Sequence, residues 1–107
     1  MLTVILCILA LIAPTDEQIA NAIYRAEGGA RACVPYGILS VKVKDAADAR
    51  RICLNTIRNN RRRWQAAGRP GDYIDFLATR YAPIGAKNDP HGLNNNWAKN
   101  VKRFLKN

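Results

Sequence analysis

The sequence contains few residues of the kinds that bind metals. It has one histidine, His91, and three cysteines, Cys7, Cys33 and Cys53, and no two cysteines form a CxxC pair. Protein zinc sites are built from histidine and cysteine ligands at short spacings along the chain. The sequence therefore argues against a zinc site, and we expect neither a metal nor a cofactor.

The cysteines leave one structural alternative open. Cys7 lies in an apolar N-terminal run, so Cys33 and Cys53 are the pair that could form a disulfide. A disulfide requires an oxidising compartment and a suitable Cα separation, which sequence does not give. The alternative is two free thiols, with Cys53 packed in the core.

Acidic residues are also scarce. The 107 residues include 17 Lys and Arg but only 8 Asp and Glu, so the net charge is +9. Such a surface attracts polyanions, and both nucleic acid and an anionic bacterial wall qualify. The length suits one domain, and 49% hydrophobic residues are enough for a core.

The N-terminal run lacks charge altogether. Residues 2–13 read LTVILCILALIA, which is the length of a signal-peptide core and shorter than the ~20 residues of a membrane span. No Lys or Arg precedes the run, and Pro14 follows the small residue Ala13, and both features are unusual for a signal peptide. A first helix or strand packed into the domain is the alternative. We favour an export or membrane-targeting segment over 1–14, followed by a domain over 15–107.

Four helices are predicted in that domain. Thr15 and Gln18 form a capping-box pattern, and Gly28-Gly29 would end the first helix. Asp45 would begin a second helix, with Arg50, Arg51, Arg58, Arg61 and Arg62 on its outer face. The third would begin near Asp72 and the last near Asn95, with Trp97, Val101, Phe104 and Leu105 as its apolar stripe. Residues 34–43 are apolar and rich in β-branched side chains, and they predict a short, irregular strand or hairpin. The fold class is therefore mainly α, with a small β segment.

Glu27 is the residue that helix physics explains least well. Of the two glutamates, Glu17 lies in a first helical turn, where the helix dipole favours an acid. Glu27 lies in the last turn of the same helix, where the dipole disfavours it. A carboxyl group placed there and partly covered has a raised pKa, which a general acid near neutral pH needs. The alternative is a solvated glutamate that forms an ion pair with Arg25 or Arg31.

Four segments in order resemble the lysozyme-like superfamily, especially lytic transglycosylases and related muramidases. Residues 22–29 (AIYRAEGG) and 35–41 (PYGILSV) resemble the helix that ends in a catalytic Glu and the aromatic-Gly-hydrophobic segment that follows it. Residues 76–83 (FLATRYAP) and 94–97 (NNNW) resemble the far side of the cleft. The pattern usually has Glu-Ser and then Gly-Leu-Met-Gln; here Gly28 replaces that Ser, and Leu39-Ser40 stand in place of Met-Gln.

The resemblance implies a role for each matching residue. Glu27 would be the general acid and base that cleaves the β-1,4 bond between N-acetylmuramic acid and N-acetylglucosamine. Tyr36, Gly37 and Ser40 would line the sugar cleft. Aromatics and amides outside the evident core suit sugar binding, and they add Tyr81, Asn94, Asn95, Asn96 and Trp97, although Tyr81 and Trp97 also fit core stripes.

Glycosidases commonly use two carboxylates, and no obvious partner for Glu27 exists in the sequence. Lytic transglycosylases need only one acid, because the C6 hydroxyl of the substrate completes the reaction. If Asp45 or Asp89 lined the cleft, simple hydrolysis would become possible.

The predicted partner is therefore the peptidoglycan glycan strand. We expect a monomer at the cell wall that is periplasmic, secreted or membrane-associated, with transient membrane contact through the N-terminal run. The main alternative is a nucleic-acid-binding module built on the run Arg61-Arg62-Arg63, although no groove-reading motif accompanies it. A third possibility is a wall-binding domain without catalytic activity.

Overall fold

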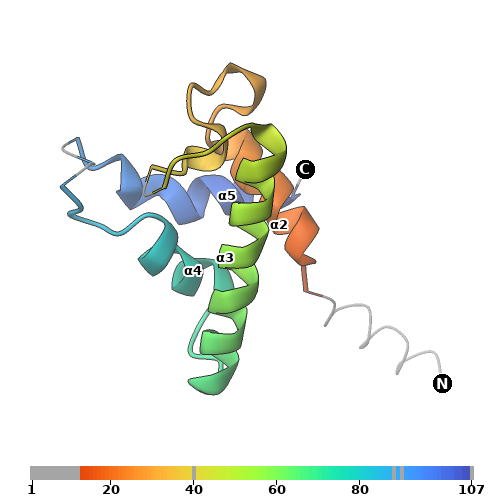
Figure 1. The fold of residues 1–107 in the computed structure, drawn as a ribbon. Helices are drawn as coiled ribbons and strands as arrows, with labels where there is room; N and C mark the ends of the chain where they lie inside the picture. The colour runs from red at the N-terminus through yellow and green to blue at the C-terminus, as the bar shows by residue number, and fades with distance from the viewer. Residues whose placement is uncertain (1–12, 40, 88, 90, 107) are drawn as a thin grey trace.

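The computed structural model describes residues 13–39, 41–87, 89 and 91–106, and this part is mainly helical, as predicted (Figure 1). Its α-helices are α2 (Asp16–Ala26), α3 (Ala46–Ala66), α4 (Tyr73–Tyr81) and α5 (Trp97–Lys106). Its 3-10 turns are η1 (Gly29–Arg31), η2 (Pro35–Gly37) and η3 (Leu93–Asn96). Residues 1–12 of the predicted targeting segment lie outside the described residues. Across the described ranges, no helix has both the length and the apolar character needed to cross a membrane.

The predicted helix starts are confirmed. The Gln18 amide donates to Thr15 Oγ1 at 3.1 Å, and the Thr15 amide donates to Gln18 Oε1 at 2.8 Å, which completes the capping box. Asp45 caps α3 and Asp72 caps α4, each by accepting the backbone N–H three residues later. These caps satisfy N–H groups that have no partner inside the helix, so polar side chains fix where each helix begins.

The core lies where α2 and α3 meet α4 and α5. Helix α2 packs against both α3 and α5, and α4 packs against the same two helices, with the long α3 running along one side of the molecule (Figure 1). The largest fully buried side chains come from all four helices: Ile19, Ile23, Cys53, Ile57, Leu77 and Val101. This packing fixes the C-terminus of α2 relative to the N-terminus of α5, where the candidate site is found.

The predicted β segment is not formed in the described residues of 34–43. Pro35–Gly37 is instead a 3-10 turn, in which Tyr36 and Gly37 have φ of +60° and +65°. Two successive left-handed residues reverse the chain, and Pro35 has no N–H to donate to a neighbouring strand. Tyr36 and Ile38 of this segment are buried in the core and Val43 packs against it, whereas Leu39 and Val41 are exposed.

The arginines of α3 do not form one solvated face. Arg50 donates from Nη1 to the Tyr36 hydroxyl at 3.1 Å and to Asn21 Oδ1 at 3.0 Å. Arg61 donates from Nε to Asp16 Oδ1 at 2.9 Å. Two arginines predicted to face solvent therefore connect α3 to α2 and to the turn after it.

Both described cysteines are free thiols. Cys53 is fully buried and Cys33 is exposed. Burial raises the pKa of the Cys53 thiol to about 11. Of the two alternatives from the sequence, the structure shows the free thiols, with Cys53 in the core.

Candidate active site

Glu27 occupies the C-cap of α2. Its amide donates to the Ile23 carbonyl at 2.9 Å, and Gly28 then leaves the helix with φ of +107°. The predicted end of this helix is therefore confirmed. The side chain is half-buried, and burial raises the pKa of its carboxyl group because the charged form loses solvation.

Trp97 lies beside this carboxyl group. Its side chain is only 5% exposed, and its Nε1–H is buried without a well-formed hydrogen bond. The same N–H is close enough to Glu27 to lower the pKa of the carboxyl group, which partly offsets the effect of burial. We interpret the contact as a poorly aligned one that becomes stronger when the carboxyl group is charged.

Gly37 brings the backbone of η2 against the same carboxyl group. A Cβ atom added at Gly37 would lie 2.5 Å from Glu27 Oε2 and 2.6 Å from Cδ. Only glycine permits this approach, and it also permits the φ of +65°. The turn therefore covers one side of Glu27 with backbone rather than with a side chain.

Tyr36 anchors the η2 turn through contacts of its ring, its hydroxyl and its carbonyl group. The ring is 5% exposed and lies 5.1 Å from the Tyr24 ring, and its hydroxyl accepts a hydrogen bond from Arg50. The Tyr36 carbonyl accepts from the Tyr81 hydroxyl at 2.7 Å. Such a network can hold a non-glycine residue in a left-handed conformation that otherwise costs about 1 to 2 kcal/mol.

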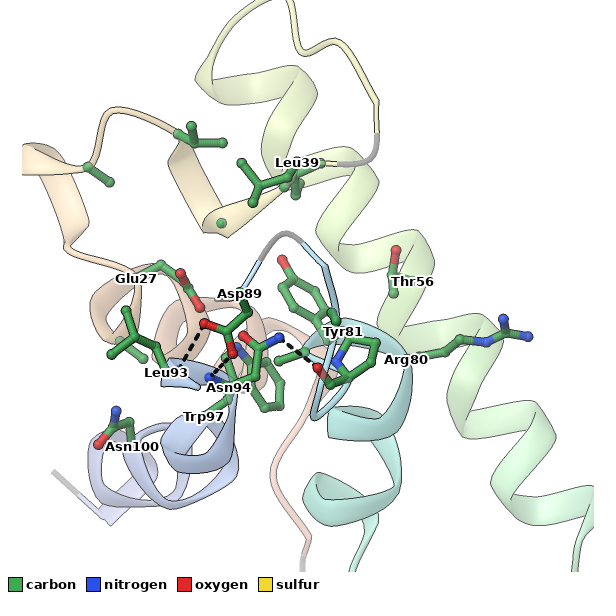
Figure 2. Close-up of a pocket in the computed structure, with 18 of the residues that line it drawn as sticks. Glu27, Leu39, Thr56, Arg80, Tyr81, Asp89, Leu93, Asn94, Trp97 and Asn100 are labelled. Carbon is green, nitrogen blue, oxygen red and sulfur yellow. Dashed lines mark hydrogen bonds between the residues drawn. The ribbon is translucent and has the colours of Figure 1, made fainter. Parts of the chain in front are cut away.

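Tyr81 and Trp97 form a stacked aromatic pair. Their ring centroids are 5.0 Å apart and the planes are inclined by 23°. Both rings line the same cavity as Glu27, and Figure 2 shows the three side chains around it. The last turn of α4 and the first turn of α5 therefore supply an aromatic surface next to the acid.

These residues belong to a cleft of about 800 Å³. Its polar lining consists mainly of neutral groups, among them the amides of Asn94, Asn96 and Asn100. Among the residues that the structure describes, three charged side chains line it: Glu27, Asp89 and Arg80. A cleft with so few cations in a protein of net charge +9 suits a polar, mostly uncharged ligand.

Asp89 places a second carboxylate on the cleft. Its Oδ1 accepts the Leu93 amide at 2.9 Å, and its Oδ2 accepts the Asn94 amide at 2.8 Å (Figure 2). Asn94 in turn donates from Nδ2 to the Pro83 carbonyl at 2.8 Å. Asp89 thus anchors the loop that carries η3. Asp45 caps α3 and does not line the cleft.

The structure brings together some of the predicted site residues and separates others. Glu27, Gly37, Tyr81, Asn94, Asn96 and Trp97 all line the cleft. Tyr36 does not, which corrects the sequence-based prediction, because its ring packs into the core beneath the turn. Asn95 is exposed and outside the lining, since successive residues of η3 point in different directions. Ser40 lies outside the described residues.

Sequence reasoning missed several cleft residues, among them three with polar side chains on the helices. Arg80 is in the last turn of α4, Asn100 follows Asn96 by one helical turn, and Thr56 was placed in the core face of α3. The spacing of Asn96 and Asn100 could have indicated that they share a face. Nothing in the sequence alone indicates that α3 and α4 meet at this cleft.

No protein-family model, curated protein or solved structure matches the chain. Within the described residues, no group of three or more His, Cys, Asp or Glu side chains gathers as a possible metal site.

Proposed function

We propose that this chain is a peptidoglycan-cleaving glycosidase with Glu27 as its general acid and base. One observation carries the proposal: a half-buried carboxyl group with a raised pKa lies on a neutral, amide-lined cleft beside two stacked aromatic rings. Cleavage of a glycosidic bond needs an acid that still holds its proton near neutral pH. Aromatic faces and amides are the groups that bind acetamido sugars.

The charge distribution favours this substrate over nucleic acid. A surface that binds nucleic acid presents several Lys or Arg side chains to the phosphates. The cleft presents one, Arg80, and two arginines of the α3 run are engaged within the protein, Arg50 with Tyr36 and Arg61 with Asp16. Arg62 and Arg63 are exposed, but the Arg-rich helix presents fewer free arginines to a nucleic acid than its sequence suggests.

The reaction begins with proton transfer from the Glu27 carboxyl group to the glycosidic oxygen between N-acetylmuramic acid and N-acetylglucosamine. The C1–O bond then breaks, and the leaving sugar keeps the proton and the bonding electrons. The Glu27 carboxylate next removes the proton of the C6 hydroxyl, whose oxygen bonds to C1 and forms an anhydro ring. Glu27 is protonated again at the end, so the cycle closes without a second acid.

Gly37 favours the protonated form of the Glu27 carboxyl group, and Trp97 favours the charged form. Burial beneath the Gly37 backbone favours the protonated form that gives the proton. The Trp97 N–H can bond more strongly to the carboxylate left behind, because a hydrogen bond to a charged acceptor is stronger. The two contacts let one residue serve first as acid and then as base.

Asp89 is the candidate for a second carboxylate if water is the acceptor. Both of its oxygens already accept backbone N–H groups, which favours an anchoring role. We therefore propose the anhydro product as the main outcome and hydrolysis as the alternative. The lysozyme-like fold and a location at the cell wall as a monomer belong to the same proposal.

The test is digestion of purified peptidoglycan by the full chain and by Glu27→Gln, with products identified by mass spectrometry. Gln has the size of Glu but cannot give the proton. We expect cleavage to fall by a factor of about 100 to 10,000, the usual contribution of a general acid. A wild-type product lighter by one water molecule than the hydrolysis product identifies the anhydro sugar.

Glu17→Gln is the matched control. It makes the same chemical change on the same helix, at an exposed residue outside the cleft. The proposal predicts that this variant cleaves like the wild type. Equal cleavage by Glu27→Gln would contradict the role of Glu27, and wall binding without any cleavage would identify an inactive wall-binding domain.

A further inference from the structure

Within the described part of the chain, Arg80 is the one cation that lines the cleft, and its charge has no role in the chemistry proposed for Glu27. It lies in the last turn of α4, and its side chain is exposed. Figure 2 draws Glu27 and Arg80 on opposite sides of Tyr81. A ligand long enough to pass Tyr81 would therefore reach both groups.

Some cations of the described residues pair with acids, whereas others, Arg62 among them, form no ion pair. Arg51 pairs with Asp48 at 2.7 Å, Arg61 pairs with Asp16, and Lys102 pairs with Asp75 at 2.8 Å. Within the described residues, Arg80 forms no ion pair. Asp89, the other acid on the cleft besides Glu27, is occupied by two backbone amides.

Apart from Glu27, Asp89 and Arg80, the described residues that line the cleft are uncharged. Thr56 from α3 and Pro83 after α4 are among them, and Figure 2 shows Tyr81 between Arg80 and Glu27. A guanidinium group on a cleft with few other charges can bind one planar anion specifically, because it can donate two parallel N–H groups to a carboxylate.

We propose that Arg80 is a specificity-determining residue that binds a carboxylate carried by the glycan, so that the cleft selects acidic N-acetylated glycans over neutral ones. This inference rests on the proposed function and names the substrate class within it. The carboxylate could belong to an acidic sugar or to a peptide attached to it. A purely structural role for Arg80, such as complementing the dipole at the end of α4, predicts no such selectivity.

The experiment measures binding rather than cleavage, in the Glu27→Gln background so that the ligand stays intact. The probes are soluble peptidoglycan fragments with free carboxyl groups, the same fragments with carboxyl groups converted to methylamides, and a neutral N-acetylglucosamine oligomer. Calorimetry compares three proteins: Glu27→Gln alone, with Arg80→Gln added, and with Arg62→Gln added.

Arg62→Gln is the matched control, because it removes the same charge from an exposed helical arginine outside the cleft. We expect Arg80→Gln to weaken binding of the free-carboxyl fragments about tenfold, as a lost charge-assisted contact does. Binding of the methylamide fragments and of the neutral oligomer should stay unchanged. Arg62→Gln should alter none of these affinities by more than about twofold, a size set by the screening of exposed charges.

The outcomes separate this inference from the proposed function. If Arg80→Gln binds all three probes as Arg62→Gln does, the carboxylate site is disproved while the glycan cleft stands. If Arg80→Gln weakens binding of every probe equally, Arg80 has a structural role, and thermal melts will show the loss of stability. If the parent protein binds no glycan, the proposed function fails together with the inference.

A last comparison identifies the source of the carboxylate. Fragments from which the peptides have been removed retain only the acidic sugar. If Arg80→Gln still weakens their binding about tenfold, the sugar carboxylate is the ligand; if the difference disappears, the peptide carboxylate is the ligand. Either result supports the proposal, whereas no effect of Arg80→Gln on any probe, or an equal effect on every probe, overturns it.

Discussion

The cleft and the long helix α3 use charge in opposite ways. Helix α3 carries six of the arginines within 21 residues, and three of them, Arg50, Arg58 and Arg61, bind acids or a hydroxyl of other elements. The cleft carries one arginine and two acids in a lining of twenty-one residues. The most conspicuous feature of the sequence therefore stabilises the fold, and the chemistry is proposed where charge is sparse.

The difference has a physical reason. A charge on an exposed helix is solvated, and its pKa changes little; a carboxyl group in a cleft with neutral walls loses solvation and changes its pKa. Glu27, covered by the Gly37 backbone, illustrates the second case. Substitutions in the cleft should therefore mainly affect activity, and substitutions on α3 should mainly affect stability.

The largest effect is expected from Gly37→Ala. The new Cβ would meet the Glu27 carboxyl group at 2.5 Å, in a backbone with φ of +65°. The left-handed backbone alone should cost about 1 to 2 kcal/mol of unfolding free energy, and the crowding about 1 to 3 kcal/mol more. Because the displaced group is the proposed acid, peptidoglycan cleavage should fall at least about a hundredfold.

Gly71→Ala separates the effect of a left-handed backbone from the effect of the contact between the new Cβ and Glu27. Gly71 has the same φ of +65°, but nothing lies within 4 Å of an added Cβ, and the residue does not line the cleft. Chemical denaturation should show the smaller loss for this variant, with cleavage unchanged. If Gly37→Ala and Gly71→Ala cleaved peptidoglycan equally well, Gly37 would have no role in the proposed active site.

A smaller effect, this time on stability, is expected from Arg61→Gln. The variant loses the 2.9 Å ion pair with Asp16 and the stacking of the guanidinium at 4.4 Å over the Tyr73 ring. Both ion-pair side chains are less than one-quarter exposed, so we expect a loss of about 1 kcal/mol rather than the near-zero value of a surface pair.

Arg62→Gln is the neighbour for comparison, because its side chain is exposed and outside the cleft. Its stability should stay within about 0.5 kcal/mol of the wild type. Denaturation curves of Arg61→Gln and Arg62→Gln, together with a DNA-binding assay of both variants, test whether the arginines of α3 stabilise the fold or bind nucleic acid. A large loss of DNA affinity in Arg62→Gln with normal stability would revive the nucleic-acid alternative.

Local rules in the sequence predicted the helices well. Thr15, Asp45 and Asp72 cap helices where expected, since capping depends on residues only three positions apart. The position of Glu27 at the end of α2 followed from Gly28 in the same way. For Glu27 the local analysis gave both the place of the residue and the direction of its pKa change.

Contacts between distant segments were not predictable in this way. Tyr36 looked like a cleft aromatic beside Gly37, but Arg50 on α3 and Tyr81 on α4 hold it in the core. The β-branched residues of 34–43 suggested a strand, whereas Pro35 and two left-handed residues make a turn. Arg80 and Asn100 join the cleft only because α4 and α5 pack together.

The subtlest expected effect is a dependence of stability on pH that comes from Glu27. Burial raises the pKa of this carboxyl group above its ordinary value of 4.5, so the folded protein holds the proton more tightly than the unfolded chain. The resulting stabilisation is complete below pH 4.5 and is lost as the pH rises through the raised value. Glu27→Gln, which stays neutral, should therefore gain stability over the wild type as the pH rises through this window.

Thermal melts of the two proteins across the acidic and neutral range measure this difference, and Trp97→Phe sharpens it. The Trp97 N–H lowers the pKa of Glu27, so its removal should extend the window to higher pH. Each comparison needs only the difference between two curves, which cancels the other titrating groups. A constant difference between wild type and Glu27→Gln at every pH would mean that Glu27 is solvated like the charges of α3, and the contrast between the two regions would be lost.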